Sequence, residues 1–322
     1  MKLIKRILNF FNTSAKYTIR KRNKITKVLG TIVIYLLLIT TAYVFLYPFI
    51  RMISYSLMSS PDIVNPDVNW IPTRLYFGNF EASMFVLKGW EATYNSMWFS
   101  TTLAVAQTFV SAMTGYAFAR YNFTMKKTLF TLILISFIIP VPIILGPRYI
   151  MFVEATRLTG VQFVNTVYPQ LLFAFLGQGV NSAILILIFY NFFRMIPNQL
   201  FEASRIDGAN GWQQFWHITV KMSLSTIVVV FLFSFVWNWN EMYVTNMFAQ
   251  QSIILMPRQL AIFDGLFRAP ETSGGNPAGT NLLSEAYKMS ATFISMIPLF
   301  VIYGLAQRQF IEGIENTGIT GE

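Results

Sequence analysis

The sequence predicts an all-α membrane protein with about six transmembrane helices. Only 12% of the 322 residues are charged and 54% are hydrophobic, whereas soluble proteins carry about 25% charged residues. Six stretches of about 19 residues or more contain no Asp, Glu, Lys or Arg, and a helix needs about 20 such residues to cross a membrane. Cysteine is absent and histidine occurs once. An ordinary soluble enzyme is therefore excluded, and we predict neither a catalytic nor a metal site.

The charge-free windows define the predicted spans in chain order. The fourth window, residues 158–193, is too long for one straight helix, so we expect a lead-in segment near 160–167 and then a helix to about Phe193. Residues 242–257 are also uncharged but contain several amides, so we expect an external or re-entrant segment; if this segment spans, the later topology inverts. The predicted transmembrane domain is 28–307, and its spans are 28–50, 92–119, 128–147, 166–193, 222–245 and 289–307.

The distribution of positive charge predicts the orientation. Of the 24 Lys and Arg residues, 16 lie in residues 1–27, in the second–third and fourth–fifth loops, and in the tail 308–322. By the positive-inside rule, both termini are cytoplasmic. The basic segment 1–27 is expected to fix this topology and to contact anionic lipid headgroups. The net charge of +10 therefore requires no nucleic acid.

The fourth–fifth loop, residues 196–221, is the most informative segment. Pro197 ends one helix or opens the next, and Gly208 and Gly211 permit a sharp turn between two short helices. Acids at Glu202 and Asp207 accompany an apolar face, a combination that suits docking into a groove on a partner. The chain lacks the G-x-x-x-x-G-K-[ST] phosphate loop, so it does not hydrolyse nucleotide by that route.

This loop resembles the EAA motif of bacterial ABC importer permeases, in the spacing Glu202-Ala203-Ser204-x3-Gly208-x9-Ile218. The segment 206–209 is similar to the carbohydrate subgroup related to the second permease of the maltose importer. Further similarities occur in order at 116–120, 239–241 and 307–313. Two departures stand out. Ser204 replaces the usual second Ala, and Val220-Lys221 replaces Leu-Pro, which leaves the helix free to run straight into the fifth span.

The resemblance implies the type I ABC importer permease fold, in a multi-pass protein of a bacterial inner (plasma) membrane. It implies a heterodimer with a second homologous permease, two cytoplasmic ABC ATPase subunits that bind ATP and Mg, and an extracytoplasmic solute-binding protein. No cofactor is expected in this chain. Residues 196–221, named the coupling loop below, would contact the ATPase, with Glu202 as charged anchor and Gly208 as the turn. The residues implied are Glu202, Ala203, Ser204, Asp207, Gly208 and Ala209.

A different interpretation of this loop is that Glu202 and Asp207 simply pair with Arg205 or Arg194 on a solvated face. His217 is expected to lie at the cytoplasmic interface and not to carry protons.

For the translocation path we consider polar and aromatic residues near the end of the fifth span. Aromatic rings pack against the C–H faces of sugars, whereas amides and carboxylates bind hydroxyl groups, so such a mixture suits an oligosaccharide. The other interpretation is that these residues cap and anchor the fifth helix at the outer interface. Asn95 and Asn181 are weaker candidates. The predicted path residues are Asn238, Trp239, Asn240, Glu241 and Asn95.

Two further functions stay open from the sequence. An ion-coupled secondary carrier would need buried ionisable groups within its spans, and only Glu241 lies deep. An ABC importer permease for a non-sugar solute is the other alternative. A membrane-embedded enzyme has little support, because a chain with one histidine and no cysteine offers few catalytic clusters.

Overall fold

The computed structural model describes residues 2–268 and 277–318, with side chains described for 27–267 and 285–309. Every regular element in these residues is a helix. The helices are α1 Lys2–Ser56, α2 Ser60–Val64, α3 Gly78–Val86, α4 Gly89–Arg120, α5 Lys126–Ile138, α6 Val141–Thr159, α7 Tyr168–Phe175, α8 Ser182–Met195, α9 Asn198–Ile206, α10 Gly211–Gln214, the π-helix η1 Phe215–Val220, α11 Leu224–Trp239, α12 Tyr243–Phe248, α13 Met256–Ala261, α14 Phe263–Arg268 and α15 Pro277–Gly318.

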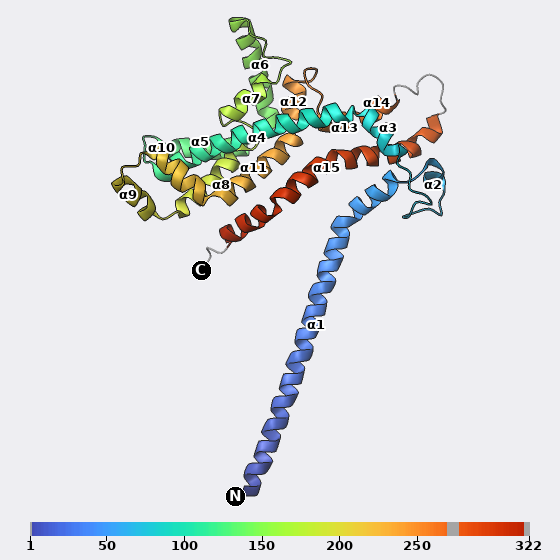
Figure 1. Cartoon of the computed structure of the whole chain (residues 1–322), viewed down its shortest axis with the longest axis vertical. Helices are drawn as coiled ribbons and strands as arrows, with labels where there is room; N and C mark the ends of the chain where they lie inside the picture. Colours follow the sequence, from blue (N-terminus) through green and yellow to red (C-terminus); the bar gives the residue numbers. More distant parts are fainter. Residues whose placement is uncertain (1, 269–276, 319–322) are drawn as a thin grey trace.

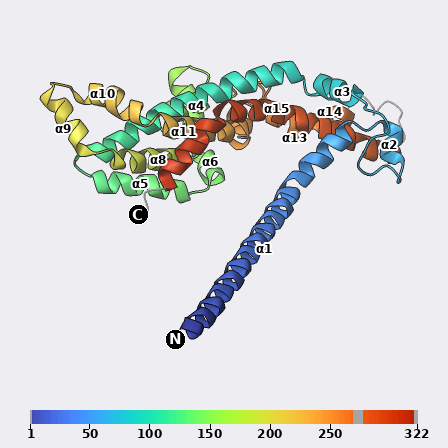
Figure 2. The same ribbon diagram turned by 60° about the horizontal axis from the view of Figure 1, so that its bottom comes forward.

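Helix α4 is the central element of the fold. It packs against α8 and α11, and it runs from the end of the molecule that carries α2 and α3 to the end that carries α9 and α10 (Figure 1). Its 32 residues correspond to a length of about 48 Å at the α-helical rise. Helix α1 leaves this body as a long separate rod, and both chain termini lie away from the α2 end (Figures 1 and 2).

Small and polar residues allow α4 to occupy the centre. At Gly115, an added Cβ would lie 2.7 Å from Phe189 Cβ and 3.0 Å from the Tyr190 backbone nitrogen. The glycine therefore allows the α4 and α8 backbones to approach closely, as small residues do between membrane helices. Buried Gln107 accepts a hydrogen bond from Ser234 Oγ of α11 at 2.6 Å. Several polar residues of α4 lie on its buried face, whereas its exposed face carries apolar residues such as Tyr94, Val105 and Phe109.

The described residues contain two helices that are long and apolar enough to cross a membrane on their own, Lys27–Ser56 and Glu285–Gln309. Up to five spans result if each of three bent helix pairs counts as one. One such pair is α5 and α6, which meet at 107° where Pro140 excludes a helical conformation for Ile139. The predicted span 128–147 contains this bend. Helix α4 has 32 residues but is not among these candidates. The count of six spans stays a prediction.

The fourth predicted span, 166–193, differs from the expected single helix. It contains α7 and α8, separated by residues 176–181. Gly177 and Asn181 in this break have φ values of +71° and +53°, which a continuing right-handed helix does not permit. An added Cβ at Gly179 would lie 1.8 Å from Gln107 Nε2. The break therefore packs against α4 at Gly179, where there is no room for a side chain.

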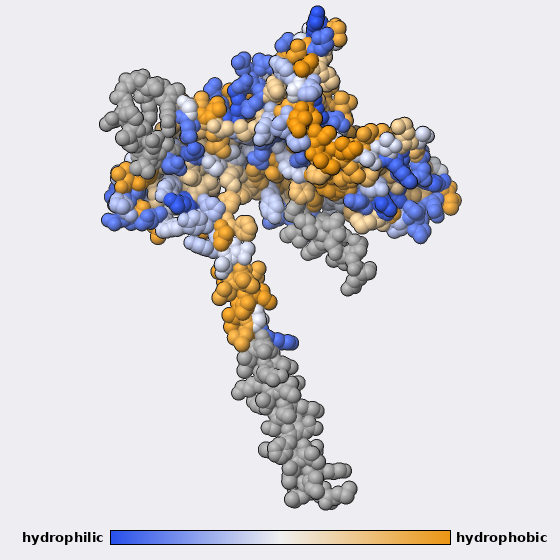
Figure 3. Space-filling model, turned by 180° about the vertical axis from the view of Figure 1, so that it is seen from behind, coloured by the Kyte–Doolittle hydropathy of each residue, from blue (hydrophilic) through white to orange (hydrophobic). Residues whose placement is uncertain are grey.

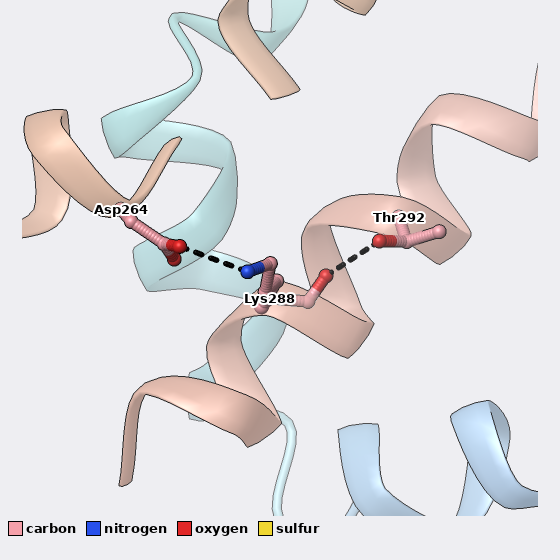
Figure 4. A network of polar contacts seen from close by, with 3 residues as sticks. All are labelled: Asp264, Lys288 and Thr292. Carbon is pink, nitrogen blue, oxygen red and sulfur yellow. Dashed lines mark hydrogen bonds and ion pairs between the residues drawn. The ribbon is translucent and has the colours of Figure 1, made fainter. Parts of the chain in front are cut away.

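Polar contacts hold the end that carries α2 and α3 together. Asn79 of α3 donates its amide to the Ser56 and Met58 carbonyls at 3.0 and 2.8 Å. Lys288 of α15 pairs with Asp264 of α14 at 2.8 Å, and Thr292 donates to the Lys288 carbonyl (Figure 4).

Hydropathy varies along the length of the molecule. Figure 3 shows hydrophobic residues over part of α1 and in a patch on the body, and hydrophilic residues at both ends of the body and at the tip of α6.

Candidate functional site

The coupling loop is a folded helical corner. Helix α8 ends at Met195, and α9 then leaves at an angle of 73°. Ile196 has an extended backbone, with ψ of 125°, because the following Pro197 disfavours a helical conformation. Phe201 is the buried residue of α9, and it packs with Tyr116 of α4 and Phe215 of η1 in one apolar cluster. The loop is therefore anchored on the central helix.

Arg120, the last residue of α4, fixes this corner. Its Nη2 donates to the backbone carbonyls of Phe193 and Ile196, the latter at 2.7 Å, and its Nη1 donates to Asn198 Oδ1, also at 2.7 Å. The guanidinium also stacks over the Phe201 ring, 4.0 Å from its centroid. Charged donors to the carbonyls at a helix C-terminus stabilise it. One side chain thus joins the end of α4 to both α8 and α9.

A Schellman motif at Gly208 ends α9. The amide of Gly208 donates to the Arg205 carbonyl at 3.0 Å, and the amide of Ala209 donates to the Ser204 carbonyl at 2.9 Å. Gly208 has a φ of +82°, a left-handed conformation that glycine adopts without steric cost. The turn that the sequence predicts at Gly208 is therefore present and has a defined geometry.

Ser204, which departs from the EAA pattern, links α9 to α10 within the coupling loop. Buried Gln214 donates to Ser204 Oγ at 2.9 Å and to the Phe201 carbonyl at 3.2 Å. Asn210 and Gln213 form a reciprocal capping box at the start of α10, with hydrogen bonds of 2.9 and 2.8 Å. An alanine at 204 would leave Gln214 with one partner fewer.

We predict that Ser204→Ala loosens the loop without unfolding it. The substitution removes one buried hydrogen bond, which contributes about 1 kcal/mol, while Gln214 keeps the Phe201 carbonyl. Hydrogen exchange of the 209–214 amides should accelerate about fivefold. Ser252→Ala, at a part-buried hydroxyl that caps a distant turn, is the control. Unchanged exchange in the Ser204 variant would show that this link does not order the loop.

An acidic and apolar surface of the loop is left without a partner in the described residues. Glu202 and Asp207 are exposed, and neither is among the ion pairs of that part of the chain. Arg194 instead contacts Tyr190, both through its hydroxyl and over its ring. The Ile206 side chain is 88% exposed. A groove of about 270 Å³ adjoins this surface, lined by Ser204, Asp207, Gly208, Ala209, Gln213, Gln214, His217 and Ile218.

The junction with the fifth span bends although it lacks a proline. The segment 211–220 meets α11 at 86°, whereas the sequence suggested a straight continuation. Buried Ser223 lies at the bend, where its hydroxyl and its amide both donate to the Thr219 carbonyl, at 2.6 and 3.1 Å. These bonds satisfy the Ser223 polar groups inside the turn. The π-helical turns of η1 directly precede the bend.

The predicted path residues occupy different environments. Asn238 is buried between α11 and α4, where it donates to Gln107 Oε1 at 3.2 Å. Trp239 is 2% exposed and belongs to an apolar core with Phe235. Asn240 is exposed and donates to the Val236 carbonyl of its own helix. Of these three, only Asn238 lines the cavity described below.

Glu241 and Asn95 hold backbone in place. The Glu241 carboxylate accepts hydrogen bonds from the backbone amides of Val244 at 2.7 Å and Thr245 at 3.0 Å, at the start of α12. Asn95 donates to the Ile254 carbonyl at 3.1 Å. The structure therefore does not bring the five predicted path residues together at one surface.

A cavity of about 300 Å³ lies beside Asn238 and the break between α7 and α8. Asn181, a weaker sequence candidate, lines it. Sequence reasoning missed the other polar residues, although amides inside the charge-free windows 92–119 and 158–193 were a usable signal. These missed residues are Gln107, Ser136, Arg148, Gln170, Gln178 and Ser182.

Residues 108–316 match the family described as binding-protein-dependent transport system inner membrane component. The chain belongs to this family. The matched segment includes the whole coupling loop, whose rigid corner and exposed acids are described above. The protein is therefore a permease subunit of an ABC importer and an inner-membrane component, a class that works with a binding protein and an ATPase. Membership of the family decides against the ion-coupled carrier.

Relatives and a solved structure agree with this assignment. The sn-glycerol-3-phosphate transport system permease protein of Brucella suis is 24% identical over 310 residues, which cover 92% of this chain and 99% of that protein. The arabinooligosaccharides transport system permease protein of Halalkalibacterium halodurans is 23% identical, covering 87% and 93%.

The solved structure is that of a bacterial ABC transporter involved in the import of the acidic polysaccharide alginate. One of its chains matches with a TM-score of 0.67 and 19% identity, covering 88% of this chain and 96% of that chain. This match shows that the two chains share the ABC importer permease fold.

Proposed function

We propose that this permease forms the translocation path for a carbohydrate together with a second homologous permease. An extracytoplasmic binding protein delivers the solute, and two ATPase subunits drive its movement. The chain itself is non-catalytic and needs no cofactor, since ATP and Mg bind to the ATPase. Relatives named for arabinooligosaccharides and sn-glycerol 3-phosphate, and a structural neighbour that imports alginate, support a sugar or a sugar-like solute.

The geometry of the coupling loop carries the proposal. A coupling element must transmit force. Helix α9 is fixed to α4 through Arg120 and to α10 through Gln214. Its tip nevertheless offers exposed Glu202, Ile206 and Asp207 to a partner. When ATP closes the ATPase pair, a displacement of α9 is passed to the transmembrane helices through these contacts.

Helix α1 supports assembly with a second permease. Its residues 28–46 are exposed in the isolated chain and almost entirely apolar. Such a surface needs lipid or another subunit to cover it. We place both termini and the coupling loop in the cytoplasm, as the distribution of Lys and Arg predicts. The α2 and α3 end then faces the binding protein.

The test is Glu202→Ala in the complete importer reconstituted in liposomes. Glu202 makes no ion pair within the described part of the chain, so its loss should leave the permease folded. We expect ATP hydrolysis stimulated by the loaded binding protein to fall at least tenfold. Replacing the exposed Glu91 by Ala, an equal change of charge at the opposite end of α4, should have little effect. Full stimulation in the Glu202 variant would contradict the anchor role, and failure of any ATPase to associate with wild type would overturn the proposed function.

A further inference from the structure

The cavity beside the α7–α8 break contains a single described cation, Arg148 of α6. The guanidinium donates through Nη2 to Gln178 Oε1 at 3.2 Å and through Nη1 to the Gln178 carbonyl at 3.4 Å. It also lies over the Phe173 ring, 4.3 Å from the centroid. All these partners are uncharged, and the ion pairs of the described residues do not include Arg148. Its charge is thus not neutralised within that part of the chain.

Two buried polar atoms in the same wall also lack partners. Gln170 and Ser182 are 6% and 4% exposed, and both line the cavity. Gln170 Oε1 and Ser182 Oγ have no hydrogen-bond partner in the described residues. Buried polar groups are normally satisfied, and an unsatisfied one costs about 1–3 kcal/mol. Two residues with unpartnered buried polar atoms, Gln170 and Ser182, and the uncompensated cation Arg148 therefore line one cavity.

We propose that this cavity is a subsite for an acidic sugar residue, with the carboxylate of a uronic acid opposite Arg148. A guanidinium offers five N–H donors, and two contacts to Gln178 leave others free to bind a carboxylate. Gln170 Oε1 accepts a sugar hydroxyl, and Ser182 Oγ exchanges hydrogen bonds with another. This inference rests on the proposed function and adds the charge of the solute to it.

The charge balance favours a carboxylate over a phosphate. A phosphate group carries about −1.5 to −2 charges at neutral pH, whereas Arg148 is the one cation among the described lining residues. A carboxylate carries a single charge and matches the planar guanidinium in two parallel hydrogen bonds. The amides of Gln107, Asn181 and Asn238 in the same wall suit the hydroxyl groups of a sugar.

The experiment is equilibrium binding to the complete importer in lipid nanodiscs, measured by calorimetry. The probes are disaccharides of galacturonate, mannuronate and glucuronate, their neutral counterparts, and galactose phosphate. We expect at least one uronate disaccharide to bind wild type about tenfold more tightly than its neutral counterpart. Arg148→Gln should reduce this preference below about twofold, whereas Arg148→Lys should keep part of it.

Arg157→Gln is the matched control, because Arg157 lies on the same helix with its side chain 81% exposed. Four outcomes would each overturn the subsite. Wild type binds acidic and neutral probes equally, the preference survives in Arg148→Gln, galactose phosphate binds more tightly than the uronates, or no probe binds. If the Arg148→Gln importer does not assemble, the test uses the preference of wild type for acidic probes and the preference that Arg148→Lys retains. Intact ATP-driven uptake without a charge preference defeats this inference alone, whereas the absence of an associated ATPase defeats the proposed function.

Discussion

Arg120→Ala is expected to separate ATP hydrolysis from solute movement. The substitution removes the donor shared by the Phe193 and Ile196 carbonyls and the contact to Asn198. Hydrogen bonds from a charged group contribute about 1.5–3 kcal/mol each, so α9 should lose its fixed position relative to α4. Uptake by the reconstituted importer should fall at least tenfold, while hydrolysis without substrate persists.

Arg194→Ala is the control for this prediction. Arg194 belongs to the same corner, but it is exposed and contacts the hydroxyl and the ring of Tyr190. Its loss should change uptake by less than about twofold, as exposed contacts contribute little. Arg120→Lys keeps the charge but not the forked geometry, and it should fall between the two. Wild-type uptake in Arg120→Ala would mean that the corner is held by apolar packing alone.

Gly115→Val is expected to have the largest effect on stability. The new Cβ would lie 2.7 Å from Phe189 Cβ and 3.2 Å from the Ile186 carbonyl oxygen, so α4 and α8 would have to separate. Overpacking of this kind destabilises the folded state by about 1–3 kcal/mol or more. Here it affects the contact between α4 and α8, the central helix pair. The yield of assembled complex after detergent extraction should drop several-fold. The midpoint temperature of thermal unfolding should also fall.

Gly304→Ala provides the comparison on α15. A Cβ at Gly304 would meet nothing within 4 Å, and alanine is the better helix former by about 1 kcal/mol. This variant should extract as well as wild type or better. A Gly115 variant with an unchanged midpoint would show that the α4–α8 contact is not needed for assembly.

The sequence predicted the parts of this protein that are encoded locally. Charge-free windows require only a count of residues, because hydrocarbon selects uncharged stretches regardless of the fold. The turn at Gly208 was predictable because glycine alone adopts its φ of +82° without steric cost. The family resemblance of the coupling loop, carried by Glu202, Ala203 and Gly208, is confirmed by the family match over 108–316.

Contacts between distant segments were not predictable in the same way. No local pattern indicates that Ser204 binds Gln214, or that the chain bends by 86° before α11 although the usual proline is missing. The five path residues Asn95, Asn238, Trp239, Asn240 and Glu241 were chosen by type and spacing, but their environments depend on which helices surround them. Trp239 packs into a core with Phe235 and Met256, a setting that only the tertiary structure decides.

The sequence by itself determined the all-α membrane class, the family and the position of the coupling loop, since each follows from composition or from residues close together in the chain. The tertiary structure alone decided that Arg120 joins three helices, that α7 and α8 are separate, and that Arg148, Gln170 and Ser182 line one cavity. The physical reason is that these features depend on distances between segments far apart in sequence, and such distances are set by close packing around α4.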